Sequence, residues 1–238
     1  MTGTTPPGVT GEQDAARWVR EMFGRVSGRY DLLNHLLSFN LDKRWRARVV
    51  ERVTPILKPG AQVLDLCCGT GDLLVALESR RCAPVVGSDF CHPMLVQARR
   101  KIAASLLFEA DALNLPVRDD SLDLITIAFG VRNFANYRKG LDEVYRVIKP
   151  GGLAAILEFS QPQNRAFGAL YGFFSARILP WVGGLVSGSR EAYSYLPESI
   201  QKFPGAEALA AEIRSAGFST VEFERLSGGA VALHLAWK

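Results

Sequence analysis

The chain has 238 residues, of which 48% are hydrophobic and 22% charged, and its formal net charge is +4. This length fits one domain with insertions better than two domains, and the composition is that of a globular chain able to bury a full core. The mildly basic charge is compatible with a nucleic-acid binder, a membrane-surface enzyme or an ordinary soluble protein, so it selects no function alone.

The cysteines and the apolar stretches argue against two classes of protein. The cysteines are Cys67, Cys68, Cys82 and Cys91. They form no C-x-x-C pair and no histidine cluster lies nearby, so we expect no structural zinc and no other metal. No signal peptide is recognisable, which predicts a reduced, cytosolic compartment. The most apolar stretch, 166–187, is interrupted by Arg177 and Pro180, so we expect no membrane-spanning helix.

The beginning of the chain is polar, and two amphipathic segments follow it. Residues 1–11 are rich in proline, glycine and threonine, which predicts a disordered lead. Residues 12–24 and 43–53 carry apolar side chains at helical spacing, which predicts two helices.

Strand and helix patterns then alternate as far as residue 160. The expected strands are 62–68, 84–89, 105–111, 122–130 and 153–159, and the expected helices between them are 71–81, 92–102 and 136–148. A less regular insert over 161–203 comes next. The expected closing elements are a helix at 205–218 and strands at 219–226 and 230–237.

This alternation predicts an α/β fold with a mostly parallel, Rossmann-like sheet of about seven strands. The last two strands are joined by the short "SGG", which favours an antiparallel pair, so the last strand is expected to be reversed. We expect a single domain over 12–238. Its parts are N-terminal helices (12–60), a cofactor-binding core (61–160), a helical substrate or lid insert (161–203) and a closing helix with strands (204–238).

The segment "VLDLCCGTGD" (63–72) places a glycine-rich turn between an expected strand and an expected helix. In that context Gly69, Thr70 and Gly71 predict a ligand-binding turn, because glycine lets the backbone approach a ligand and the helix start offers free N–H groups. Position 74 is leucine, so the dinucleotide motif is incomplete, and there is no Walker lysine. The turn therefore favours a nucleoside without a pyrophosphate, such as S-adenosylmethionine.

Acidic residues stand at the ends of three consecutive expected strands. Asp65 is placed to pair with the cationic amino-acid end of such a ligand, and Asp89 can accept hydrogen bonds from ribose hydroxyls. Asp111 and Ala112 would lie beside the adenine ring. Each acid alone could instead be an ordinary turn residue or helix cap.

Several segments together resemble a known family. They are "VLDLCCGTGD" (63–72), "GSDF" (87–90), "EADALNLP" (109–116), "RVIKPGGLAAILEFS" (146–160), "YDLLNHLLSFNLDKRW" (30–45), "FGVRNF" (129–134), "YSYLPESI" (193–200) and "GGAVALH" (228–234). The chain resembles class I S-adenosylmethionine-dependent methyltransferases, and in particular the ubiquinone/menaquinone biosynthesis C-methyltransferases, over residues 17–238.

The resemblance implies cofactor contacts at Thr70, Asp89, Phe90, Asp111 and Ala112. Two departures from the family pattern stand out. Ala128 replaces a common serine near the cofactor, and Asn40 and Asp42 replace a usual glycine and histidine. No role of that histidine is therefore carried over to Asp42.

The implied reaction is methylation of a ring carbon of a polyprenylated quinol, with S-adenosylhomocysteine as the second product. Demethylmenaquinol is the favoured substrate, and a polyprenyl methoxybenzoquinol or a phytyl naphthoquinol are the alternatives. The implied setting is cytoplasmic, with contact to the inner face of the membrane, no nucleic acid, and a homodimer as one option for the assembly.

The reaction needs a group that stabilises a developing oxyanion and a group that moves a proton. Arg132 is the first candidate for the oxyanion, with Asn133 assisting, and the alternative for Arg132 is a structural arginine that binds a loop carbonyl. His234 and Tyr193 are weaker candidates for proton transfer, and His234 could be a satisfied buried imidazole instead. For His35 we expect a surface role.

The substrate side is assigned to aromatic residues and to the insert. The candidates for substrate contact are Tyr30, Phe129, Tyr171 and Phe174. The apolar segment 166–187 can line a groove for an isoprenoid tail or rest on a membrane surface, and it could also be a helical cap or a dimer interface.

Three other function classes stay open. An RNA or protein methyltransferase is disfavoured because there is no lysine-rich stripe and no N-P-P-Y-type motif follows the fourth expected strand. A nucleoside sensor without activity would be expected to have lost site residues, yet the acids and glycines are present. A dinucleotide oxidoreductase is disfavoured by the missing third glycine.

Overall fold

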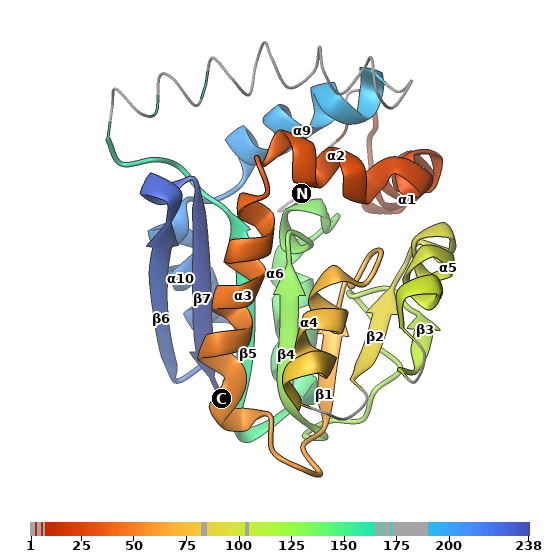
Figure 1. Cartoon of the computed structure of the whole chain (residues 1–238). Coiled ribbons are helices and arrows are strands. Elements are labelled where there is room, and N and C mark those ends of the chain that lie inside the picture. The colour runs from red at the N-terminus through yellow and green to blue at the C-terminus, as the bar shows by residue number, and fades with distance from the viewer. Residues whose placement is uncertain are drawn as a thin grey trace.

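A seven-stranded sheet in the order β3-β2-β1-β4-β5-β7-β6 forms the centre of this computed structural model (Figure 1). The strands are β1 (Val63–Leu66), β2 (Val86–Asp89), β3 (Leu107–Glu109), β4 (Leu122–Ala128), β5 (Ile148–Phe159), β6 (Thr220–Leu226) and β7 (Val231–Trp237). Neighbours pair in parallel except around β7, which runs antiparallel to both β5 and β6. The predicted Rossmann-like sheet with a reversed last strand is confirmed.

The structure describes residues 3, 6, 8–81, 85–102, 105–164, 168, 172 and 190–238, without the side chains of 81 and 190–194. Residues 1, 2, 4, 5 and 7 of the predicted lead, Cys82, and the predicted substrate residues Tyr171 and Phe174 lie outside this description. Among the described helices, none is both long and apolar enough to cross a bilayer.

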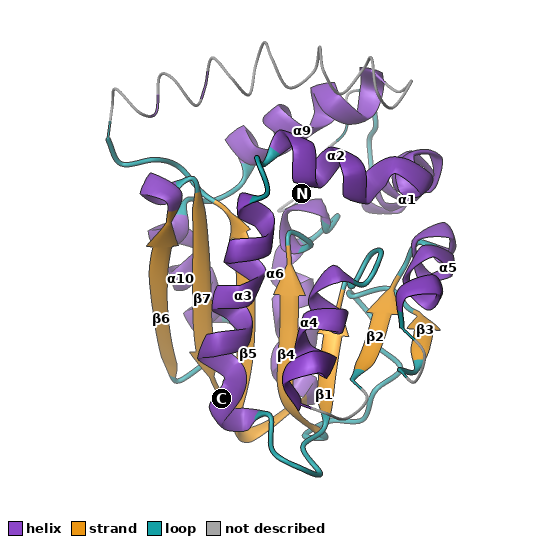
Figure 2. Cartoon of the chain, in the orientation of Figure 1, coloured by secondary structure: helices purple, strands orange, loops and turns teal. Residues whose placement is uncertain are grey.

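Helices cover both faces of the sheet (Figure 2). On one face lie α3 (Leu41–Val53), α4 (Asp72–Arg81) and α5 (His92–Lys101), whose buried side chains share one apolar cluster. On the other face lie α6 (Tyr137–Val147) and α10 (Ala206–Ser215), which contribute to a second cluster. Both clusters are built on the alternating inward side chains of the strands, and this three-layer packing holds the strand ends in fixed positions.

A third group of helices lies across the end of the sheet to which the arrow of β4 points (Figure 1). This cap consists of α1 (Glu12–Val26), α2 (Tyr30–Leu37) and α9 (Arg190–Lys202). The cap has its own small apolar cluster, in which Val19, Met22 and Leu33 pack with Tyr195. It therefore covers the carboxyl ends of the parallel strands, where α/β proteins bind ligands.

The structure differs from the sequence prediction in three places. Helix α2 was not predicted, whereas α9 agrees with the expected helical insert. Strand β5 begins at Ile148, the last residue of the expected helix 136–148, because Ile148 already pairs with Leu122 before the register shifts. Strand β3 ends at Glu109, so Asp111 lies in the following loop rather than in the strand.

Candidate active site

A cavity opens where β1, β2 and β4 end beneath the cap, and the space between its walls, open solvent included, is about 720 Å³. It is lined by Ala16, Phe23, Tyr30, Leu66, Cys67, Gly69, Asp89, Phe90, Met94, Ala110, Asp111, Ala112, Leu113, Ala128, Phe129, Gly130, Asn133, Phe134 and Ala135. A side pocket of about 370 Å³ adjoins it, and the two share Tyr30, Cys67, Gly69, Ala128 and Phe129. The side pocket adds Arg46, Asp65, Cys68, Thr70, Asp72 and Leu73.

The glycine-rich turn follows β1 as predicted and forms one wall of both hollows. Gly71 has φ 84°, and a Cβ there would lie 3.2 Å from the Cβ of Ala98 on α5. Only glycine meets both demands, the left-handed backbone and the close approach of α5. The turn brings Gly69 to the cavity wall, while Gly71 supports the turn from behind and is not part of the lining.

Asp89 lies at the end of β2, and its carboxylate ties the turn in place. Its Oδ2 accepts a hydrogen bond from the Gly69 backbone N–H and its Oδ1 one from the Cys91 N–H, both at 2.9 Å. Burial raises the pKa of this carboxyl to about 6. Since Asp89 also lines the cavity, it can accept hydrogen bonds from ligand hydroxyls on its remaining lone pairs.

Asp65 on β1 is almost completely buried, with 1% of its surface exposed. Its Oδ1 accepts a hydrogen bond from the Thr126 hydroxyl at 2.6 Å, and its Oδ2 has no partner among the described residues. Burial raises the pKa of Asp65 to about 7. An unpaired buried carboxylate oxygen beside the side pocket is suited to a cationic ligand group.

The other predicted cofactor residues gather around the same cavity. Phe90, Asp111, Ala112 and Ala128 line it, and Thr70 lines the side pocket. Ala128 ends β4 with only a methyl group, so this position offers the cavity no side-chain hydrogen bond.

Of the four predicted catalytic residues, one lines the cavity and two are buried outside its lining. The side chain of the fourth is outside the described part of the chain. Asn133 lines the cavity, where its Nδ2 donates to the Phe129 carbonyl at 3.2 Å and its Oδ1 accepts from the Tyr195 hydroxyl at 3.2 Å. The backbone of Tyr193 belongs to α9, but its side chain is outside the described part of the chain.

Arg132 is buried behind the cavity wall rather than in its lining. Its Nη1 donates to the Glu158 carboxylate at 2.8 Å and to the Phe129 carbonyl at 2.5 Å, and its guanidinium stacks 5.0 Å from the Phe159 ring centre. These are the contacts of the structural alternative, an arginine that binds a loop carbonyl. Phe129, held by this contact, has φ 60° and lines both hollows.

His234 lies on β7, away from the residues that line the cavity. One ring nitrogen contacts the Ala206 carbonyl at 2.9 Å, the other has no described partner, and the ring packs against Phe223. Burial lowers the pKa of this imidazole. Its surroundings are those of a buried core histidine, which was the alternative to proton transfer.

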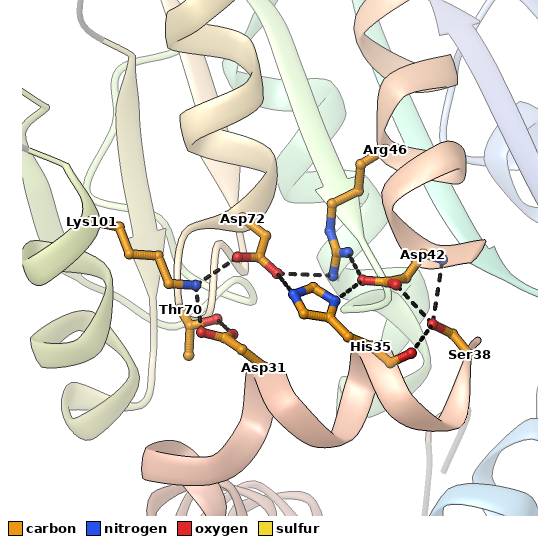
Figure 3. A network of polar contacts seen from close by, with 8 residues as sticks. All are labelled: Asp31, His35, Ser38, Asp42, Arg46, Thr70, Asp72 and Lys101. Atoms are coloured by element: carbon orange, nitrogen blue, oxygen red, sulfur yellow. Dashed lines mark hydrogen bonds and ion pairs between the residues drawn. The ribbon is translucent and has the colours of Figure 1, made fainter. Parts of the chain in front are cut away.

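A network of polar side chains joins the cap to the ligand turn (Figure 3). Its members are Asp31, His35, Ser38, Asp42, Arg46, Thr70, Asp72 and Lys101. From the cap, Asp31 accepts a hydrogen bond from the Thr70 hydroxyl and pairs with Lys101 at 2.6 Å. The sequence indicated no partner for His35, but its Nδ1 lies 2.8 Å from Asp42, with 26% of the side chain still exposed. The network fixes α2 over the site.

The carboxyl groups of this network were largely missed by the sequence analysis. His35, Asp42 and Asp72 place ligand atoms within 4.8 Å of one another and could hold a cation. Arg46 already pairs with Asp42 at 2.5 Å, and Lys101 with Asp72 at 2.6 Å. The expectation of a metal-free enzyme therefore stays a prediction. The available signal was the departure at position 42, where the family pattern has histidine.

Comparison with known proteins shows which family this chain belongs to. The sequence pattern of the ubiE/COQ5 methyltransferase family matches residues 9–238. This chain belongs to that family. The sequence is 51% identical over 219 residues to the demethylmenaquinone methyltransferase of Thermus thermophilus, covering 90% of this chain and 98% of the relative. It is 44% identical to the ubiquinone/menaquinone biosynthesis C-methyltransferase of Geobacter sulfurreducens, covering 84% and 80%.

The fold of this ubiE/COQ5 family member is shared with more distant enzymes. An S-adenosylmethionine-dependent methyltransferase from Thermotoga maritima superposes with a TM-score of 0.64 at 19% identity, covering 92% of this chain and 99% of the other. At that identity the likeness supports the fold alone. Family membership makes the chain a methyltransferase, as the sequence predicted.

Proposed function

We propose that this methyltransferase transfers a methyl group from S-adenosylmethionine to a ring carbon of a polyprenylated quinol, converting demethylmenaquinol to menaquinol. One observation carries the choice of substrate: a relative named for this demethylmenaquinone reaction is 51% identical and spans nearly the whole chain. Methylation of a methoxybenzoquinol in ubiquinone synthesis is the second candidate, favoured by the name of the 44% identical Geobacter relative.

The residues at the cavity fit S-adenosylmethionine. The unpartnered Oδ2 of Asp65 would receive the ammonium group, and Asp89 would accept from the ribose hydroxyls. Asp111 and Ala112 are available for the adenine, beside the apolar ring of Phe90. The bound cofactor would supply an electrophilic methyl group, which requires an electron-rich carbon as its acceptor.

The chain's own part is to hold the quinol ring and to favour its deprotonated form. Tyr30 and Phe129 line the cavity and are proposed to contact the ring. Burial raises the pKa of Tyr30, so its hydroxyl stays protonated and can donate a hydrogen bond to a developing oxyanion. Asn133, held by Tyr195 and the Phe129 carbonyl, is proposed as a second donor, while Arg132 is proposed to position Phe129 and Asn133 from behind.

A long isoprenoid tail needs an apolar surface outside the cavity. The sequence assigns this role to 166–187, including Tyr171 and Phe174, which the structure does not describe. Helix α2 offers a further apolar surface, because Leu32 and Leu36 are 61% and 48% exposed and Phe39, just beyond the helix, is 73% exposed. Exposed Lys43 and Arg44 follow at the start of α3. We call the surface formed by Leu32, Leu36, Phe39, Lys43 and Arg44 the α2 ridge. We propose that the α2 ridge rests on an anionic membrane surface, from which the substrate enters.

The test is incubation of the purified protein with labelled S-adenosylmethionine and either reduced demethylnaphthoquinol or reduced methoxybenzoquinol, followed by mass analysis. We expect label in the naphthoquinol product and much less in the benzoquinol product. The reverse preference would support the second candidate, and label in neither would contradict the proposal.

A further inference from the structure

Arg46 lines the side pocket. Among the described residues that line either hollow, it is the single cationic side chain. The acids around it include Asp65 and Asp72 in the side pocket and Asp89 in the main cavity. A ligand carboxylate placed in such acidic surroundings would need a positive partner. Arg46, with 11% of its side chain exposed, is the one lining group able to provide it.

Asp42 holds Arg46 in place, and Arg46 still has N–H donors available for a ligand. Its Nη1 donates to Asp42 Oδ2 at 2.5 Å, whereas its Nη2 lies 3.8 Å from Asp72, beyond hydrogen-bond distance. Asp72 is instead engaged by Lys101 at 2.6 Å. A guanidinium has five N–H donors, so further donors of Arg46 are left for a ligand.

Asp42 fixes the direction of Arg46 (Figure 3). Burial alone would raise the pKa of Asp42, but the hydrogen bonds from Ser38, Arg46 and His35 outweigh it and hold the pKa below its usual value. Asp42 therefore stays charged and keeps Arg46 directed along the side pocket that Asp65 also lines.

We infer that Arg46 binds the α-carboxylate of S-adenosylmethionine, while Asp65 binds its ammonium group, so that the side pocket is the subsite for the amino-acid end. Guanidinium recognises a carboxylate by paired, charge-assisted hydrogen bonds, which fits this assignment. Asp42, Ser38 and His35 act as positioning residues through Arg46. The inference rests on the proposed use of this cofactor.

The test compares two ligands that differ only in the carboxylate: S-adenosylmethionine and its decarboxylated analogue. Calorimetry should show that the wild type prefers S-adenosylmethionine. Arg46→Gln should weaken S-adenosylmethionine binding by about 10- to 100-fold and leave the analogue nearly unchanged, so that the preference disappears. Arg52→Gln removes a charge from the same helix at a position that lines neither hollow, and it should keep the wild-type preference.

Equal weakening of both ligands by Arg46→Gln would assign Arg46 a merely structural role and overturn the inference, as would an unchanged affinity for S-adenosylmethionine. If Arg46→Gln does not fold, Arg46→Lys serves, because it keeps the charge and should retain part of the preference, and loss of all preference in that variant would count against the inference. A wild type that binds neither ligand would overturn the proposed function itself, whereas a wild type that binds both equally would overturn only the role of Arg46.

Discussion

The Thr126 hydroxyl bonds one oxygen of Asp65 at 2.6 Å and leaves the other oxygen buried without a described partner. The two residues stand opposite each other in the parallel pairing of β1 and β4, so the sheet itself creates this half-satisfied carboxyl. Because burial raises its pKa to about 7, Asp65 is close to its protonation midpoint at neutral pH. A cationic ligand group would supply the missing partner and favour the charged form.

This arrangement predicts a pH-dependent affinity for S-adenosylmethionine. Affinity should rise with pH through about 7 as the Asp65 carboxylate forms, and Asp65→Asn should bind more weakly and without that rise. Calorimetry from pH 6 to 8 measures both, and an equal pH slope in the variant would contradict the assignment. The ligand-free protein should behave oppositely, because a raised acid pKa makes the contribution of Asp65 to stability fall as pH rises from 3.8 to about 7.

Asp89 should contribute to cofactor binding through the ribose. Asp89→Ala should lose about 1.5–3 kcal/mol of binding free energy, the scale of a hydrogen bond to a charged group. Glu109→Ala is the matched control, since it removes an acid from the end of the neighbouring strand that is outside the cavity lining. Calorimetry showing the same affinity for Asp89→Ala and the control would remove Asp89 from the site.

The Arg132–Glu158 pair should be a stabilising unit that acts together. Both side chains are buried, so Arg132→Gln leaves the Glu158 charge buried without its partner. This variant should lower the free energy of unfolding by about 3–5 kcal/mol. Adding Glu158→Gln should recover a large part of that loss in a double-mutant cycle followed by denaturant unfolding. If the two losses simply add, Arg132 and Glu158 do not act as a unit, and this would contradict the prediction.

The α2 ridge should govern membrane binding. Leu32→Ser with Leu36→Ser should reduce co-sedimentation with anionic lipid vesicles, while activity on a short-tailed quinol in detergent stays close to wild type. The control pair is Val96→Ser with Leu106→Ser, which removes exposed apolar side chains elsewhere on the surface. Equal vesicle binding by the two double variants would contradict the proposed surface.

The sheet could be predicted because its strands and helices alternate with clear patterns, and because "SGG" allows only a tight reversal before β7. Helix α2 could not, because it has only eight residues, from Tyr30 to Leu37, and no side chain caps its start. An apolar run of that length cannot be assigned to a helix rather than a strand from its pattern alone.

The ligand turn and the strand-end acids were also predictable, since a parallel sheet brings the ends of β1 and β2 to one edge. The partners of the charged residues could not be predicted. Glu158 meets Arg132, and Asp42 meets His35 and Arg46, through tertiary contacts that no spacing in the sequence encodes. Arg132 therefore seemed available to substrate until its buried partner was known.

The central claim is that the chain methylates a ring carbon of a quinol, and the most direct test uses deuterated-methyl S-adenosylmethionine with demethylnaphthoquinone, either reduced by dithionite or kept oxidised. The account predicts that product forms only from the reduced substrate, because an oxidised ring is too electron-poor to attack an electrophilic methyl group. It also predicts that the deuterated methyl stays on the ring carbon after the product is reoxidised to the quinone. Comparable methylation of the oxidised substrate, or a label held as a methyl ether, would contradict it.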